Sequence, residues 1–155
     1  MPLSDFLTQD AIVAGLKASS KKQALQELAE RAATVSGLNG REIFDTLLQR
    51  ERLGSTGIGH GIAIPHGKLA KVPKLFGVFA RLDKPVDFES LDGEPVDLLF
   101  VLIAPESAGA DHLKALARVA RVLRDANVTA KLRAAQDADA LFAVLMEATT
   151  TPHAA

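Results

Sequence analysis

LGSTGIGHGIAIPHGK, residues 53–68, contains five glycines and one proline in sixteen positions. Helices do not tolerate such a composition, so this stretch is predicted to be a loop. Residues 62–64 are all apolar and predict one brief strand inside it. Regular elements are therefore expected on both sides of the loop, and their order along the chain indicates the fold.

One short strand and two helices are expected before this loop. Residues 10–18 partly alternate between apolar and polar types, which predicts the strand. Apolar residues recur at helical spacing over 21–35, where two preceding serines offer N-caps and Gly37 ends the helix. Asn39 is expected to cap a second helix that runs to about Arg52.

The segment after the loop contains strands followed by helices. The run DLLFVLIA, residues 97–104, is almost continuously apolar, which fits a strand buried on both faces. The other expected elements are a strand over 75–82, turns over 85–94, a helix that Asp111 caps and that ends near Asp125, and two short helices that Asn127 and Asp137 cap and that end near Glu147.

The order of these elements predicts the fold class. Helices before, between and after buried strands form an α/β fold, in which a mixed β-sheet is flanked by helices on both sides. With 155 residues and no linker, the chain is expected to form a single domain. We expect this domain to span residues 1–148, followed by a flexible C-terminal tail at 149–155.

The composition argues against several classes of function. The chain has no cysteine, which excludes disulfides, thiolate catalysis and cysteine-based metal sites. Its net charge of -1 and its lack of Trp and Tyr argue against nucleic acid as a partner. No apolar run reaches the roughly 20 residues that span a membrane, and the N-terminus lacks the features of a secretory signal. A cytoplasmic protein without membrane insertion is therefore expected.

His66 is the residue of the loop whose surroundings suggest chemistry. Pro65 restricts the chain before it, and Gly67 is expected to leave room for a bulky group or a partner surface. A neutral imidazole is a good nucleophile toward phosphorus near neutral pH. One ring nitrogen must be open to attack, and a carbonyl acceptor on the other nitrogen would fix the tautomer. His66 is therefore a candidate phosphoryl acceptor.

Positive charge and a second histidine are available for an anion held on His66. Arg50 ends the second helix where the chain enters the loop, and a guanidinium can bond two phosphate oxygens at once. Arg52 and Lys68 also flank the loop. His112 would lie in the first turn of its helix, where backbone N–H groups attract anions. The same residue types are also common as solvated or capping side chains, and both interpretations stay open.

Three other kinds of site fit the spacing poorly. A P-loop requires four residues between its first glycine and Gly-Lys, then Ser or Thr, whereas here five residues intervene and leucine follows. The Gly-x-Ser-x-Gly nucleophile elbow is absent. A zinc site would bring together His60, His66 and His112, and no spacing strongly favours it.

RERLGSTGIGHGIAIPHGK, residues 50–68, resembles the active-site signature of IIA proteins of bacterial phosphotransferase systems, of the fructose–mannitol type. More narrowly, the chain resembles the nitrogen-regulatory branch of that family, which works without its own sugar permease. The resemblance extends from about Leu3 to Glu147 and includes DLLFVLIAP and DHLKALARVARVLRD. It implies no metal or nucleotide cofactor, because the incoming phosphoryl group already sits on a high-energy P–N bond.

The resemblance also implies roles for individual residues. His66 would accept the phosphoryl group through Nε2 from an HPr-like phosphocarrier. Arg50 would stabilise that group, and His112 would be the supporting histidine. His60 stands where similar proteins often have a small polar amide, and we predict that it is a bystander.

The function implied is that of a stoichiometric phosphoryl carrier whose phosphorylation state regulates partner proteins, such as potassium transport proteins or sensor kinases. One alternative is a sugar-specific IIA that passes phosphate to a fructose or mannitol permease subunit. Another is a binding module that keeps the fold without phosphoryl transfer. The acidic segment 81–97 and the basic residues of the last helices form either two docking faces of opposite sign or ordinary solvated surface.

Overall fold

A mixed β-sheet forms the centre of the molecule, and β6 (Val96–Pro105) runs through its middle. The computed structural model describes residues 1–150 of the chain, and side chains as far as residue 148. Every residue from 98 to 104 is fully buried, so the apolar run is covered on both faces as expected. β5 (Phe76–Val86) pairs with β6 in the antiparallel direction and contributes Phe79 to the same core.

Four shorter strands complete the sheet. The strand order across it is β1-β5-β6-β3-β2, and β4 lies off this path and pairs with β6. β1 (Ile12–Leu16) lies parallel to β5, and β2 (Gly57–Gly59) pairs antiparallel with β3. β3 (Ile62–Ala63) and β4 (His66–Leu69) both run parallel to β6. β4 had been predicted as part of a loop. Its residues have no strand pattern of their own, and they form a strand because they pair with β6.

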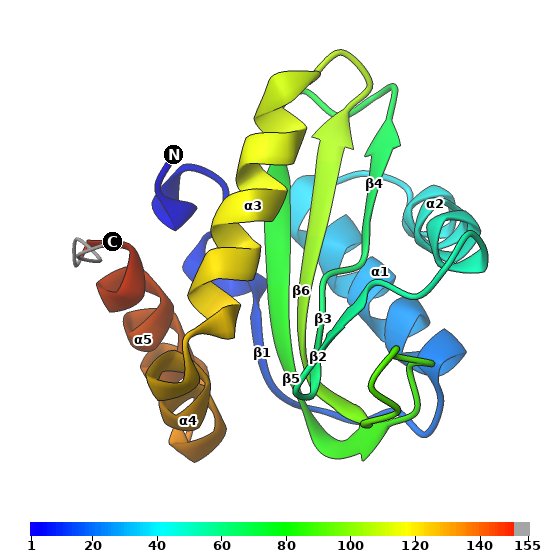
Figure 1. Ribbon diagram of the computed structural model, residues 1–155. Coiled ribbons are helices and arrows are strands. Elements are labelled where there is room, and N and C mark those ends of the chain that lie inside the picture. Colours follow the sequence, from blue (N-terminus) through cyan, green and yellow to red (C-terminus); the bar gives the residue numbers. More distant parts are fainter. Residues whose placement is uncertain (151–155) are drawn as a thin grey trace.

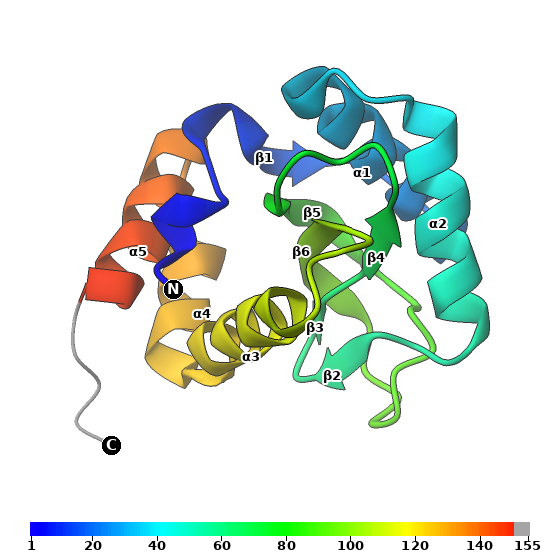
Figure 2. The ribbon, with the colours of Figure 1, turned by 90° about the horizontal axis from the view of Figure 1, so that it is seen from above.

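Helices cover both faces of the sheet (Figure 1). They are α1 (Lys21–Ser36) and α2 (Gly40–Arg52) on one face, and α3 (Ala110–Arg124), α4 (Ala126–Ala134) and α5 (Ala138–Thr150) on the other. Two short 3-10 turns, η1 (Leu3–Asp5) and η2 (Gln9–Ala11), precede β1. Figure 2 shows the sheet between the two groups of helices, which confirms the predicted α/β fold.

Most of the capping residues predicted from the sequence do set a helix boundary. Ser20 accepts a hydrogen bond from the backbone N–H of Gln23 at the start of α1, and Gly37 ends that helix in the left-handed conformation, with φ of 75°. Asn39 caps α2, and Asp137 accepts a bond from the backbone at the start of α5. Local hydrogen bonding therefore defines both ends of α1 and the starts of α2 and α5.

Two of the predicted caps are wrong. Gly109, with φ of 54°, precedes α3, so Asp111 lies inside the first turn of that helix. Asp125 caps α4 and accepts a hydrogen bond from the backbone N–H of Asn127, which had been predicted as the cap. Asp125 thus both ends α3 and starts α4, and this double use of one residue shortens the connection between the two helices.

Two elements extend beyond their predicted ends. β5 continues past Leu82 to Val86, where it pairs with Val96 of β6. α5 continues past Glu147 to Thr150. The remainder of the predicted tail at 149–155 lies outside the described residues. Within residues 1–150, no helix combines the length and the apolar character that crossing a membrane requires.

Candidate functional site

His66 begins β4, directly after the proline that separates this strand from β3. It lies opposite Leu102 of β6, whose backbone N–H donates a 3.0 Å hydrogen bond to the carbonyl of Pro65. Its side chain is half-buried. From the sequence, His66 was expected in the loop, two residues after the brief strand at residues 62–64. In the structure it is the first residue of β4, and the pairing of β4 with β6 fixes its backbone.

The imidazole of His66 is held by one hydrogen bond to the main chain. Nδ1 lies 2.7 Å from the carbonyl oxygen of Ile64. A carbonyl can only accept, so Nδ1 carries the proton in the neutral ring and Nε2 keeps its lone pair. Burial lowers the pKa of His66, and the charge of Arg50 lowers it further, against opposing effects of the Ile64 bond and Glu51. The neutral, nucleophilic form of the ring is therefore favoured near neutral pH.

His112 of α3 brings a second imidazole to this site. It lies in the first turn of α3 and is 5% exposed. Its ring centroid is 5.6 Å from that of His66, with the ring planes tilted by 52°. Burial lowers the pKa of His112, with smaller contributions from His66 and Lys68. Among the described residues, no group hydrogen-bonds to its buried Nδ1.

Arg50 completes the group of three residues that the sequence analysis selected. It lies in the last turn of α2, and Nη1 donates a 2.9 Å hydrogen bond to the carbonyl of Gly54 at the start of the loop. Its charge acts on the pKa of His66, which places it within electrostatic range of the ring. Arg52, two residues further along the same helix, is exposed. Both arginines flank the loop in the sequence, but only Arg50 is among the groups that act on the pKa of His66.

Two residues near His66 were not found by sequence reasoning. Glu51 is only 6% exposed, and its carboxylate accepts hydrogen bonds from the backbone N–H and the hydroxyl of Thr56. Neither residue stands out in the sequence, because an acid at a helix end and a threonine in a loop are common surface features. Glu51 and Thr56 could be recognised only from the fold, in which the loop packs back onto the end of α2.

Gly67 has a different role from the one predicted. A Cβ at this position would lie 2.4 Å from Cγ2 of Thr46 in α2. The missing side chain therefore lets β4 approach α2 closely, and it does not leave open space for a ligand or a partner.

Comparison with known proteins identifies the family. Residues 5–148 match the family model described as "Phosphoenolpyruvate-dependent sugar phosphotransferase system, EIIA 2". The chain belongs to this EIIA family. All three site residues, His66, Arg50 and His112, fall inside the matched region.

Relatives of this EIIA domain place it near one branch of the family. It is 62% identical to the nitrogen regulatory protein of Bradyrhizobium diazoefficiens over 145 residues, which cover 94% of this chain and 95% of the relative. It is 40% identical to the nitrogen regulatory protein of Escherichia coli, covering 98% and 94% of the two chains. The crystal structure of nitrogen regulatory protein IIA-Ntr from Neisseria meningitidis superposes with a TM-score of 0.86 at 36% identity, covering 91% of this chain and 97% of that one. These matches confirm the resemblance seen in the motif.

His60 lies at the turn between β2 and β3 of the EIIA domain. It is exposed and adopts a left-handed backbone conformation, with φ of 58°. Its N–H donates to Asp92 at 2.9 Å, and its carbonyl accepts from Arg133 of α4 at 2.8 Å. Within the described residues, no three His, Cys, Asp or Glu side chains are placed to hold a metal ion. The backbone of His60 therefore serves to fix the hairpin, and the role of its ring stays a prediction.

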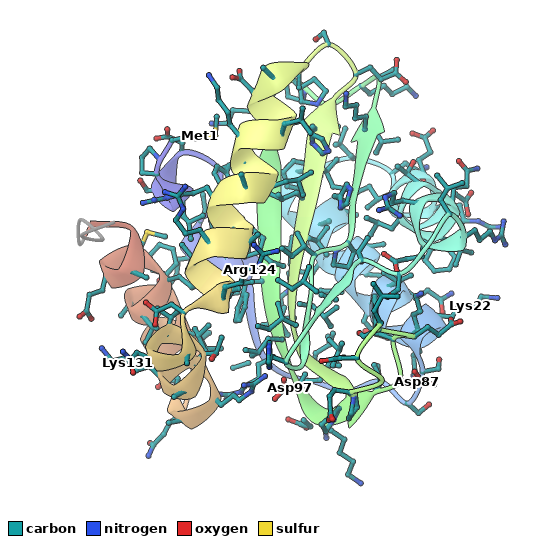
Figure 3. The ribbon with its side chains drawn as sticks, in the orientation of Figure 1. Met1, Lys22, Asp87, Asp97, Arg124 and Lys131 are labelled. Carbon is teal, nitrogen blue, oxygen red and sulfur yellow. The ribbon has the colours of Figure 1, made fainter. Side chains whose placement is uncertain are left out.

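The acidic segment and the basic helices of the EIIA domain contact each other. Arg133 of α4 binds the carboxylate of Asp97 at 2.9 Å. Arg81, in the same segment, donates to the carbonyls of Leu132 and Ala135. In Figure 3, Asp97 lies at the lower end of the sheet, where α4 packs. Asp97 and Arg133 are therefore paired within the domain, and the assignment of the remaining charges to docking faces or to ordinary solvated surface stays a prediction.

The lowered pKa values of His66 and His112 make the stability of the domain depend on pH. Histidine in the unfolded chain titrates near its ordinary value of about 6.5, above the folded values. Acid below about pH 6.5 therefore protonates the unfolded state first, and stability decreases until the pH falls below the folded pKa values. We expect urea titrations to give a lower free energy of unfolding at pH 5.5 than at pH 7.5.

A double variant, His66→Asn with His112→Asn, tests the origin of this pH dependence. Its free energy of unfolding should change less between the two pH values than that of the wild type. An unchanged difference would assign the acid sensitivity to other groups.

Proposed function

We propose that this EIIA domain is a stoichiometric phosphoryl carrier and that Nε2 of His66 is the acceptor atom. The hydrogen bond from Nδ1 to the carbonyl of Ile64 is the observation that carries the proposal, because it directs the lone pair to Nε2. In the transfer, the P–N bond of a donor phosphohistidine breaks and a new P–Nε2 bond forms. The electron pair of the broken bond stays on the donor nitrogen.

Arg50 and His112 support the same proposal. A guanidinium has five N–H donors, and Arg50 uses one of them to bond the carbonyl of Gly54, so it keeps donors that could bond phosphoryl oxygens. A buried ring nitrogen without a partner is costly, and a phosphoryl group on His66 would offer His112 acceptor oxygens within reach of the neighbouring ring. The role of Arg50 is therefore charge stabilisation, and that of His112 is support of the bound group.

A regulatory setting fits the relatives better than a sugar-specific one. The chain matches proteins named for nitrogen regulation over nearly their whole length, including one at 62% identity. The donor in this setting is an HPr-like phosphocarrier of the nitrogen-type chain, in the cytoplasm. The phosphorylation state would then determine which partner proteins are bound, with potassium transport proteins and sensor kinases as candidates. The sugar-specific IIA remains the alternative.

The test is phosphoryl transfer from two complete donor chains in parallel. The protein is incubated with phosphoenolpyruvate, an enzyme-I-type protein and an HPr-like carrier, of the nitrogen type in one reaction and of the sugar type in the other. We expect a mass increase of one acid-labile phosphoryl group, formed faster with the nitrogen-type chain. Faster transfer from the sugar-type chain would favour the alternative, and no gain from either would overturn the carrier proposal.

A further inference from the structure

A buried carboxylate lies behind the loop that carries His66. Glu51, in the last turn of α2, is 6% exposed, and a lone buried charge of this kind would be strongly destabilising. Its charge is balanced by Lys21 of α1, whose Nζ lies 3.0 Å from Oε1. The proposed transfer reaction gives neither residue a direct contact with the phosphoryl group. Their burial therefore calls for a different explanation.

A continuous chain of hydrogen bonds joins Glu51 to the ring of His66. The backbone N–H of Thr56 donates to Oε1 of Glu51 at 3.1 Å, and the Thr56 hydroxyl donates to Oε2. The carbonyl of Thr56 accepts from the N–H of Ile64 at 3.1 Å. The carbonyl of Ile64 then accepts from Nδ1 of His66 at 2.7 Å. The main chain of Thr56 and of Ile64 thus connects the buried carboxylate to the imidazole.

The Ile64 carbonyl is the link that most needs outside support. It precedes Pro65, which has no N–H to donate and is itself held through its carbonyl, which accepts from the N–H of Leu102 at 3.0 Å. β3 ends at Ala63 and β4 begins at His66, which leaves Ile64 between the two strands. The hydrogen bond from the N–H of Ile64 to the carbonyl of Thr56 therefore helps to orient this residue.

We propose that Glu51 is a positioning residue, which acts through Thr56 and Ile64 to hold His66 in the Nδ1–H tautomer with Nε2 open to the donor. Attack by Nε2 on phosphorus places positive charge on the ring, and this charge is shared with the Nδ1–H group. A carbonyl acceptor kept in place by a buried carboxylate stabilises that charge as it develops. The inference rests on the proposed function for its effect on transfer, whereas the tautomer exists without any donor.

The electrostatics of the site agree with this role. The charged or titratable groups that act on His66 are Arg50 and Glu51 from α2, and His112 faces it from α3. Glu51 raises the pKa of His66 and thereby opposes the effects of burial and of Arg50. The carboxylate thus offsets part of the loss of basicity that burial and Arg50 cause, while the pKa of His66 remains lowered on balance.

Four variants separate positioning from simple stabilisation. Glu51→Gln removes the charge, and Thr56→Val removes the hydroxyl while keeping the β-branched shape. Thr56→Ser restores the hydroxyl and is the conservative rescue. Glu89→Gln is the matched control, because Glu89 also lies near Lys21, at 3.7 Å, but is exposed and outside the chain of hydrogen bonds.

Two readouts are needed. The tautomer and the pKa of His66 are measured from its ring nitrogen chemical shifts by NMR in the unphosphorylated protein, and the rate of phosphoryl acceptance is measured with a phosphorylated HPr-like carrier. We expect Glu51→Gln and Thr56→Val to mix the two tautomers and to slow acceptance by about tenfold, as the loss of outer-shell partners does elsewhere. The pKa of His66 should also fall in Glu51→Gln. Thr56→Ser and Glu89→Gln should match the wild type.

The outcomes distinguish this inference from the proposed function. A folded Thr56→Val or Glu51→Gln protein that keeps the pure Nδ1–H tautomer and the wild-type rate would overturn the inference. If Glu51→Gln does not fold, the Thr56→Val and Thr56→Ser pair decides by the same measurements. If the wild type accepts no phosphoryl group, the proposed function fails, and the tautomer measurements still decide whether Glu51 positions the ring.

Discussion

His66→Ala is expected to abolish phosphoryl acceptance completely while the fold is retained. The variant lacks the only atom proposed to form the P–N bond, and neither Arg50 nor His112 replaces it in the geometry of the site. The ring of His66 is half-buried and belongs to no part of the apolar core, so we expect a change of only about 1 kcal/mol in the free energy of unfolding. The measurement is intact mass after incubation with the complete donor chain, together with thermal unfolding.

His60→Asn is the matched control for this variant. His60 lies in the same glycine-rich stretch, is exposed, and adopts a left-handed conformation that asparagine tolerates well. We expect this variant to accept one phosphoryl group at the wild-type rate. A phosphorylated His66→Ala protein would show that the acceptor lies elsewhere, and an inactive His60→Asn protein would show that His60 is not a bystander.

The elements that follow from local pattern were predictable from the sequence. The continuous apolar run of β6 indicated a strand buried on both faces, and Ser20, Gly37 and Asn39 marked helix boundaries by local hydrogen bonding or backbone conformation. α3 begins after Gly109 and not after Asp111, and α4 begins after Asp125, which also ends α3, and not after Asn127. At the start of α4 the sequence offers two capping candidates, Asp125 and Asn127, and the local pattern alone does not choose between them.

The candidate site was predictable only in part, for a related reason. His66 was selected by its immediate neighbours, and Arg50 and His112 by chemistry, but the 5.6 Å separation of the two rings depends on the pairing of β4 with β6 and on the packing of α3. Glu51 gave no signal, since its burial arises when the loop folds back on α2. Residues whose role depends on a contact between distant segments are found from the fold and not from spacing.

Arg50→Ala is expected to slow phosphoryl transfer by about 10²- to 10³-fold without removing the acceptor, which is the usual effect of losing one donor to a developing oxyanion. The transferred group carries charge on its equatorial oxygens, and a planar guanidinium matches two of them at once. The rate is measured by rapid quench with a phosphorylated HPr-like carrier, and the final stoichiometry should still reach one phosphoryl group. Arg50→Lys keeps the charge without the planar fork, so its rate should lie between those of the wild type and Arg50→Ala.

Arg52→Ala provides the control that gives this result its meaning. Arg52 has the same charge and lies on the same last turn of α2, but it is exposed and is not among the groups that act on the pKa of His66. We expect its transfer rate to stay within about twofold of the wild type, as for most exposed charges. Equal losses in both variants would mean that Arg50 acts only by adding positive charge to the surface. A wild-type rate in Arg50→Ala would refute its role in stabilising the phosphoryl group.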